Sequence, residues 1–354
     1  MDVMSGKAWT VLGPIDPSVL GITLTHEHLL IDEVRACFEL PEGASQRKLA
    51  GDPVTLDNLG WVRFHPLSNK DNLRLDNEDV MVGEALKFKN SGGSTIVDVT
   101  SGGLGRDPEG LRRIALRTGL NIIAGSGYYV AAAHPNEIES KDADDIRDEI
   151  VKDIRNGIGN SGIRAGVIGE IGTTWEPNMR EPWGPNERKV LQGAARAQIA
   201  TGAPLEIHPG RNRKHPNLIL EILEKEGAKM NRVVMCHMER TVGTLEEFKS
   251  IADRGCFIEF DLFGQFWYTW KLEFPYPNDA ARTFRIKELI EAGYGDQILI
   301  SQDIDNKYFT YHYGGHGYAH ILNNIVPLMS ELGITQEAIH KMIIENPRRL
   351  LTFS

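Results

Sequence analysis

The sequence has few cysteines and no long apolar run. Its 354 residues include three cysteines, Cys37, Cys236 and Cys256, an odd number without the paired spacing of a disulfide framework. The first twenty residues lack a basic segment followed by an apolar one, and no apolar stretch is long enough to span a membrane. We therefore expect a cytoplasmic protein in a reducing compartment.

The chain also has fewer basic than acidic residues. The chain carries 39 Lys and Arg against 49 Asp and Glu, a formal net charge of -10. Such a charge repels nucleic acid and anionic membrane surfaces, so we expect neither as a partner and expect a small-molecule substrate instead. Hydrophobic residues make up 41% of the chain, which is enough for a globular protein with a large core.

Two further absences bear on the fold. Solenoid-type repeats and low-complexity tracts are missing. The segment after Leu30 also lacks the glycine turn that follows the first strand of a doubly wound nucleotide-binding sheet. From about residue 93 onward, short apolar segments alternate with longer helical stretches, which indicates repeated βα units and a parallel sheet.

Eight candidate strands fit this pattern, and eight is the number that closes a (β/α)8 TIM barrel. They are Ile22–Leu30, Thr95–Thr100, Asn121–Tyr129, Ala165–Gly172, Pro204–Pro209, Arg232–Met238, Phe257–Phe263 and Ile298–Ile304. The expected helices are Asp79–Asn90, Pro108–Arg117, Asp142–Asn156, Asn186–Thr201, Pro216–Glu226, Leu245–Asp253, Ala280–Ala292 and Tyr318–Leu332. We expect one domain over residues 1–354.

Two long loops interrupt the pattern. Residues 34–71 form the largest irregular insertion, which we expect to lie over one face of the barrel. Many aromatic side chains outside a regular element indicate a pocket wall, a lid or a subunit contact, with plain packing as the alternative. Residues 264–278 carry such a set, namely Phe266, Trp267, Tyr268, Trp270, Phe274 and Tyr276.

A histidine pair ends the first expected strand. His26 and His28 lie two residues apart, so on a strand their imidazoles project from the same face and can bind one metal ion. A pair of this kind also occurs by chance, as ordinary hydrogen-bonded histidines. How strongly this pair supports a metal site therefore depends on the rest of the chain.

Four further residues of the ligand type stand at the ends of the expected strands 4, 5, 6 and 8, namely Glu170, His208, His237 and Asp303. A barrel gathers these strand ends around one mouth, where barrel active sites lie. The set suits two divalent metal ions, either zinc, manganese or another first-row metal. The simplest assignment places the histidine pair and Asp303 on one ion. The other ion takes His208 and His237, and Glu170 bridges both.

Two adjacent metal ions predict hydrolysis. They lower the pKa of a shared water and polarise a carbonyl or phosphoryl oxygen, so the attacking group is a metal-bridging hydroxide. Asp303 is the expected catalytic residue, because its second carboxylate oxygen can orient the hydroxide and carry its proton toward the leaving group.

At these residues the chain resembles the phosphotriesterase family of the amidohydrolase superfamily, most of all its phosphotriesterase-related branch. The likeness runs almost end to end. Besides the histidine pair it rests on TIVDVT at 95–100, GRD at 105–107, GIRAGVIGEIG at 162–172, EIHPG at 206–210, YGGHGY at 313–318 and IENP at 344–347. The resemblance implies the barrel, the paired metals and the same six ligands.

The sequence departs from the family's pattern at one position. Phosphotriesterase and related lactonases bridge their metals with a carboxylated lysine at the end of strand 4, where this chain has Glu170. A glutamate supplies that carboxylate without carbon dioxide, and the departure is typical of the phosphotriesterase-related branch. For that branch the resemblance implies hydrolysis of an amide, with N-acetyltaurine as the associated substrate.

Four residues are candidate substrate contacts. Arg211 follows the EIHPG motif and can bind a sulfonate tail, or it can belong to a solvated basic loop. Tyr128 and Tyr129 end strand 3, so at least one should face the mouth and hydrogen-bond a polarised oxygen. His316 lies in a glycine-flanked loop and either touches the substrate or caps the next helix.

Other functions remain open at this stage. The same hydroxide would attack a lactone or a phosphate ester, because pocket shape selects the substrate. A metal-binding scaffold without catalysis is a further alternative, against which stands the presence of every expected ligand and of Asp303. Family likeness also predicts a homodimer.

Overall fold

Eight parallel strands form the centre of the molecule. The structure is a computed structural model and describes residues 4–175, 183–266 and 276–353. The barrel strands are β3 (Thr23–Glu27), β6 (Thr95–Asp98), β7 (Asn121–Ser126), β8 (Val167–Gly172), β9 (Leu205–His208), β10 (Val233–Met235), β11 (Phe257–Phe260) and β12 (Ile298–Ile300). Their order in the sheet is their order in the chain. Each lies inside an expected segment, so the predicted barrel fold is confirmed.

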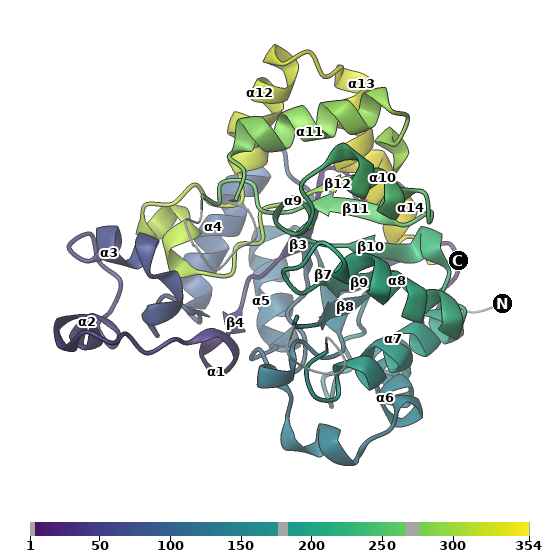
Figure 1. Ribbon diagram of the computed structural model, residues 1–354, viewed down its shortest axis with the longest axis horizontal. Helices are drawn as coiled ribbons and strands as arrows, with labels where there is room; N and C mark the ends of the chain where they lie inside the picture. The colour runs from purple at the N-terminus through teal and green to yellow at the C-terminus, as the bar shows by residue number, and fades with distance from the viewer. Residues whose placement is uncertain (1–3, 176–182, 267–275, 354) are drawn as a thin grey trace.

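Helices surround the strands (Figure 1). They are α4 (Glu78–Asn90), α5 (Pro108–Thr118), α6 (Ala143–Arg155), α7 (Glu187–Thr201), α8 (His215–Glu226), α10 (Leu245–Ala252), α11 (Asp279–Glu291) and α12 (Val326–Glu331). Capping boxes at Asp142 and Thr244 begin α6 and α10, whereas Gly202 and Gly227 end α7 and α8 in the left-handed conformation. These local signals explain why the sequence predicts the helix boundaries closely.

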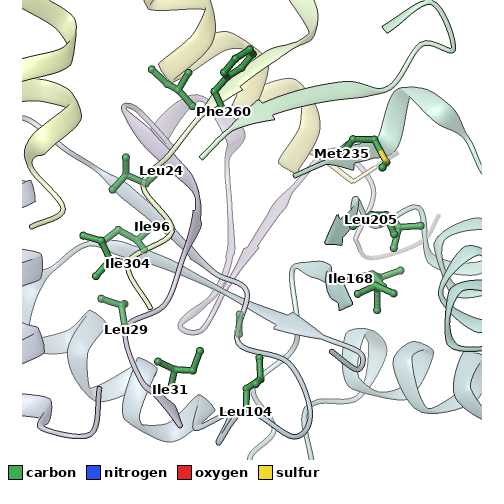
Figure 2. Packing of buried hydrophobic residues seen from close by; sticks show 14 of the residues in the cluster. Leu24, Leu29, Ile31, Ile96, Leu104, Ile168, Leu205, Met235, Phe260 and Ile304 are labelled. Atoms are coloured by element: carbon green, nitrogen blue, oxygen red, sulfur yellow. The ribbon is translucent and has the colours of Figure 1, made fainter. Parts of the chain in front are cut away.

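The strands bury an apolar face on each side. Ile168, Leu205 and Met235, from neighbouring strands, belong to the cluster in Figure 2 that also contains the buried helix residues. Because side chains alternate along a strand, Val97 and Val167 point the other way, into the barrel. Hydrophobic packing therefore holds the strand frame from both sides and leaves the carboxyl ends for polar side chains.

Side chains close the barrel between β12 and β3. The backbone N–H groups of Gln302 and Ile304 each donate to the Glu27 carboxylate at 2.9 Å. The His26 N–H donates to Ser301 Oγ at 3.1 Å. The buried Glu27 carboxylate thus joins the first strand to the segment that follows the last one.

Two parts of the chain differ from the sequence-based expectation. The insertion at 34–71 is not irregular throughout, because it contains three short helices, α1 (Val34–Cys37), α2 (Ala44–Leu49) and α3 (Leu59–Phe64). Figure 1 places α2 and α3 to one side of the strands. The expected helix Tyr318–Leu332 is present over residues 320–331, but it contains a π-helical turn, η9 (Ile321–Ile325), before α12.

The remaining elements are small. They are the antiparallel pairs β1 (Ala8–Thr10) with β2 (Gly13–Ile15) and β4 (Ile31–Asp32) with β5 (Arg74–Leu75), and the helices α9 (Met238–Thr241), α13 (Gln336–His340) and α14 (Asn346–Leu351). Trp267, Tyr268, Trp270 and Phe274 of the expected aromatic loop lie outside the described residues. Within the described ranges, no helix combines the length and the apolarity that a membrane crossing requires.

We predict that Glu27→Ala destabilises the barrel. The change removes the acceptor of two buried backbone N–H groups, and each unsatisfied group costs about 1–3 kcal/mol. The free energy of unfolding, from urea denaturation followed by circular dichroism, should fall by about 2–5 kcal/mol. Exposed Glu291 provides the control, since Glu291→Ala should change it by less than about 0.5 kcal/mol. Equal effects of the two changes would show that Glu27 does not hold the seam.

Candidate functional site

The six expected ligands come together at the carboxyl ends of the strands. His26 lies in β3 and His28 directly after it, Glu170 lies in β8, and His208 ends β9. His237 follows β10 by two residues, and Asp303 follows β12 by three. The strands are parallel and each residue lies at or within three residues of a carboxyl end, so these side chains meet at one end of the barrel.

Glu170 is at the centre of this group. Its Oε1 atom lies 2.9 Å from His26 Nε2, 3.0 Å from His237 Nε2 and 3.2 Å from His208 Nδ1. Three imidazoles from three different strands therefore face a single carboxylate oxygen. Such a carboxylate oxygen could hold a metal ion together with the imidazoles of His208 and His237.

Asp303 is the second carboxylate near the histidine pair. Its Oδ1 atom is 3.3 Å from His28 Nε2 and 3.6 Å from His26 Nε2. Asp303 and His237 both have a positive φ, 50° and 55°, a conformation that costs free energy in residues other than glycine. The Gln265 amide supports it by donating to the Asp303 carbonyl at 2.9 Å.

Partners behind the site orient the imidazoles. Asp261 Oδ1 lies 2.8 Å from His237 Nδ1, and Thr100 Oγ1 lies 2.9 Å from His28 Nδ1. In both rings the other nitrogen, Nε2, is thereby left to face the centre. Metal-ligating histidines are held in this way, so the second contacts favour the ligand role.

Three of the six groups have the protonation state of a metal ligand. Burial alone raises the pKa of Glu170, but hydrogen bonds and charge from His208, His237 and His26 outweigh it and lower the pKa well below its usual value. Burial likewise opposes ionisation of Asp303, yet its histidine neighbours lower the pKa to about 2. Burial lowers the pKa of His208 to about 3. Anionic carboxylates and a neutral imidazole are the forms that bind metal. For the other three groups, His26, His28 and His237, burial lowers the pKa, but acidic neighbours outweigh it and raise the pKa.

Unsatisfied polar atoms point to a cation at this place. His26 Nδ1 and Nε2 and Asp303 Oδ1 are buried, and although oppositely charged groups lie close to them, none of these contacts has the geometry of a hydrogen bond. Burial of such atoms is costly unless another group binds them. Possible metal-binding groups in the described chain include His26 with His237 and Asp303, and Glu170 with His208 and His237. Nitrogen and carboxylate donors of this kind fit zinc and similar divalent ions.

The ligands lie in the wall of a cavity. Its polar lining includes His28, Glu170, His208 and Asp303, together with Glu33, Tyr129, Arg211, Arg240, Gln265, Tyr276 and Asp305. The Tyr129 hydroxyl lies 3.2 Å from His208 Nδ1. Arg211 is exposed at the cavity wall. Both residues can therefore reach a molecule bound beside the ligands.

Two of the expected contact residues lie elsewhere. The Tyr128 hydroxyl donates to Glu149 Oε2 at 2.7 Å, so this tyrosine points away from the cavity. His316 stacks on His320 with 4.5 Å between ring centroids and packs against Gly264. Neither Tyr128 nor His316 is among the residues that line the cavity.

Several residues of the site were not expected from the sequence. Asp261 carried a usable signal, because it lies near the carboxyl end of the expected strand Phe257–Phe263, as the candidate ligands do in their strands. Asp305 lies two residues after Asp303 and had a weaker signal of the same kind. Glu33 and Gln265 had none, since they lie in loops without a period.

Comparison with known proteins agrees with this geometry. The model of the Phosphotriesterase family matches residues 6–351. N-acetyltaurine hydrolase of Bos taurus is 42% identical over 356 residues and the alignment covers all of both chains. Phosphotriesterase-related protein of Nematostella vectensis is 42% identical over 354 residues, with 99% of each chain covered.

Solved structures give the same result. A resiniferatoxin-binding protein from Rhodobacter sphaeroides superposes with a TM-score of 0.93 at 38% identity, covering 99% of this chain and 96% of the other. A lactonase from Listeria monocytogenes superposes with a TM-score of 0.77 at 25% identity, covering 98% and 99%. The chain belongs to the Phosphotriesterase family, a family of metal-dependent hydrolases, as its motifs indicated.

Proposed function

We propose that the protein hydrolyses the amide bond of N-acetyltaurine to acetate and taurine at a centre of two divalent metal ions. One observation carries this proposal. A relative named for that activity is 42% identical over the whole chain, and the present chain brings six suitable ligands together at its barrel mouth. The cavity beside those ligands contains an exposed arginine that suits a sulfonate.

The six ligands divide between the two ions. His26, His28 and Asp303 would hold one ion, and His208 and His237 the other, with Glu170 between them. Bound ions of this kind lower the pKa of water and polarise the carbonyl oxygen of the amide. Zinc fits the donors best, and manganese is an alternative.

The chain's own residues then handle protons and position the substrate. Asp303 accepts the proton of the attacking water, because its carboxylate lines the cavity and is ionised at neutral pH. The Tyr129 hydroxyl, beside His208, donates a hydrogen bond to the carbonyl oxygen as negative charge develops there. Arg211 binds the sulfonate with charge-assisted hydrogen bonds.

A lactonase is the second candidate. The Listeria monocytogenes lactonase has the same fold over nearly the full chain, although its identity is 25%. A lactone offers the same carbonyl centre to the same attacking water. The choice between the two functions depends on what the cavity does with the leaving group.

Acetate release from N-acetyltaurine tests the proposal. We expect metal-reconstituted protein with two ions per chain to release acetate and chelator-treated protein to release none, because the ligands alone do not activate water. A lactone and a phosphotriester are assayed in parallel. Turnover of the lactone without release of acetate would replace the proposal by the lactonase function.

We predict that Asp303→Asn separates metal binding from proton transfer. Asparagine keeps one ligand oxygen but is a far weaker proton acceptor, so kcat should fall about 10²–10⁴-fold with metal content unchanged. Metal is counted by mass spectrometry and kcat by acetate release. Exposed Asp57 gives the control Asp57→Asn, which should change neither. A variant with both ions and the original kcat would refute the role of Asp303.

We predict that Arg211→Ala weakens binding of an anionic substrate selectively. Loss of charge-assisted hydrogen bonds costs about 1.5–3 kcal/mol, or roughly a 10–100-fold higher KM for N-acetyltaurine. The KM of neutral N-ethylacetamide should not change. Arg213 lies in the same loop outside the cavity, so Arg213→Ala is the matched control. An equal effect on both substrates would exclude sulfonate recognition by Arg211.

A further inference from the structure

Glu33 is an acidic residue of the cavity that the mechanism above does not use. It lies between β4 and α1, and its side chain lines the same cavity as His28 and Asp303. Only 5% of the residue is exposed. A second carboxyl group, that of Asp305, lies in the same wall.

The Glu33 carboxyl group is held in place. Asn306 Nδ2 donates to Glu33 Oε1 at 2.9 Å and to Asp305 Oδ1 at 2.8 Å. Asn306 is fixed in turn, because Asn72 Nδ2 donates to its Oδ1 atom at 2.6 Å. Glu33 is therefore a positioned group beside the reaction centre and not a mobile surface side chain.

The surroundings of Glu33 favour its protonated form. Burial is the largest cause and raises the pKa, whereas a hydrogen bond with Cys37 opposes it. The nearby Asp303, Glu170 and Asp32 add like charge, so the pKa rises to about 8. In the described ranges no Lys, Arg or His forms an ion pair with this carboxylate.

Amide hydrolysis needs a proton donor at this place. When the carbon–nitrogen bond breaks, nitrogen must be protonated because an amine anion is too basic to leave. An alkoxide leaves from the same carbon without that absolute requirement. A positioned acid of raised pKa contributes about 10²–10⁴-fold to such a step.

We propose that Glu33 donates the proton to the leaving nitrogen and thereby makes the cavity an amidase site. This inference rests on the proposed function of the same site. It places the leaving nitrogen of the substrate near Glu33 and is compatible with a sulfonate bound by Arg211.

The step balances in atoms and electrons. Water oxygen bonds to the carbonyl carbon while Asp303 takes one proton of the water. The carbon–nitrogen bond then breaks with its electron pair on nitrogen, and Glu33 transfers its proton to that nitrogen. The proton on Asp303 restores Glu33, so one water is consumed and acetic acid and taurine are released. The acid then ionises and the amine takes up that proton.

A matched pair of substrates tests the role of Glu33. N-acetyltaurine and its ester analogue 2-acetoxyethanesulfonate share the acetyl and sulfonate groups and differ only in the leaving atom. We expect Glu33→Gln to lower kcat/KM for the amide about 10²–10⁴-fold and to lower it for the ester less than about tenfold. Glutamine keeps the oxygen that Asn306 binds, so a merely structural role predicts no difference between the substrates.

Controls distinguish the possible failures. Glu42 is exposed in the insertion at 34–71 and lies outside the cavity lining, and Glu42→Gln should leave both substrates unaffected. Metal content and the thermal midpoint are measured for each variant. If Glu33→Gln loses metal, or loses amide and ester turnover equally, or keeps amide turnover, the role of Glu33 is wrong. Wild-type protein that cleaves the ester but not the amide would instead overturn the proposed function itself, and the role of Glu33 with it.

Discussion

Closure of the barrel between its last and first strands is the constraint on which the site depends. Asp303 lies near the end of the chain and His26 near its start, yet Asp303 Oδ1 is 3.6 Å from His26 Nε2. Glu27, the residue between the two histidines of the pair, accepts hydrogen bonds from the backbone that flanks Asp303. The residues that close the seam and two of the residues proposed to bind metal therefore share one short segment, and displacing the first would displace the second.

Below the ligands the barrel interior is rich in carboxylates. Glu206 and Glu259 are fully buried there, and His26 Nδ1 lies 3.5 Å from Glu206 Oε2. Buried anions are costly unless they are paired or protonated. Divalent cations at the ligands would offset part of this charge, so metal binding would stabilise the fold as well as serve the reaction. The proposed centre is in this sense part of the core.

The cavity lining carries two chemically different kinds of group. Arg211 is a cation that fits an anionic tail, whereas Glu33 and Asp305 offer carboxyl groups fixed by one asparagine. In N-acetyltaurine the leaving nitrogen lies between the reacting carbonyl carbon and the sulfonate. The two proposals thus divide the work on this substrate: Arg211 binds the sulfonate, and Glu33 protonates the leaving nitrogen.

The sequence by itself determined the barrel and located the candidate ligands at its strand ends. Strand and helix signals are local, as at the capping boxes of Asp142 and Thr244, and each ligand follows an apolar strand segment that can be located without the fold. The sequence did not reveal that Tyr129 faces the cavity and Tyr128 does not, that His316 packs on His320, or that Glu33 lies beside Asp303. Those facts were decided only by the tertiary structure. Loop residues have no period that fixes the direction of their side chains, and contacts such as Asn306 with Glu33 join segments more than 270 residues apart.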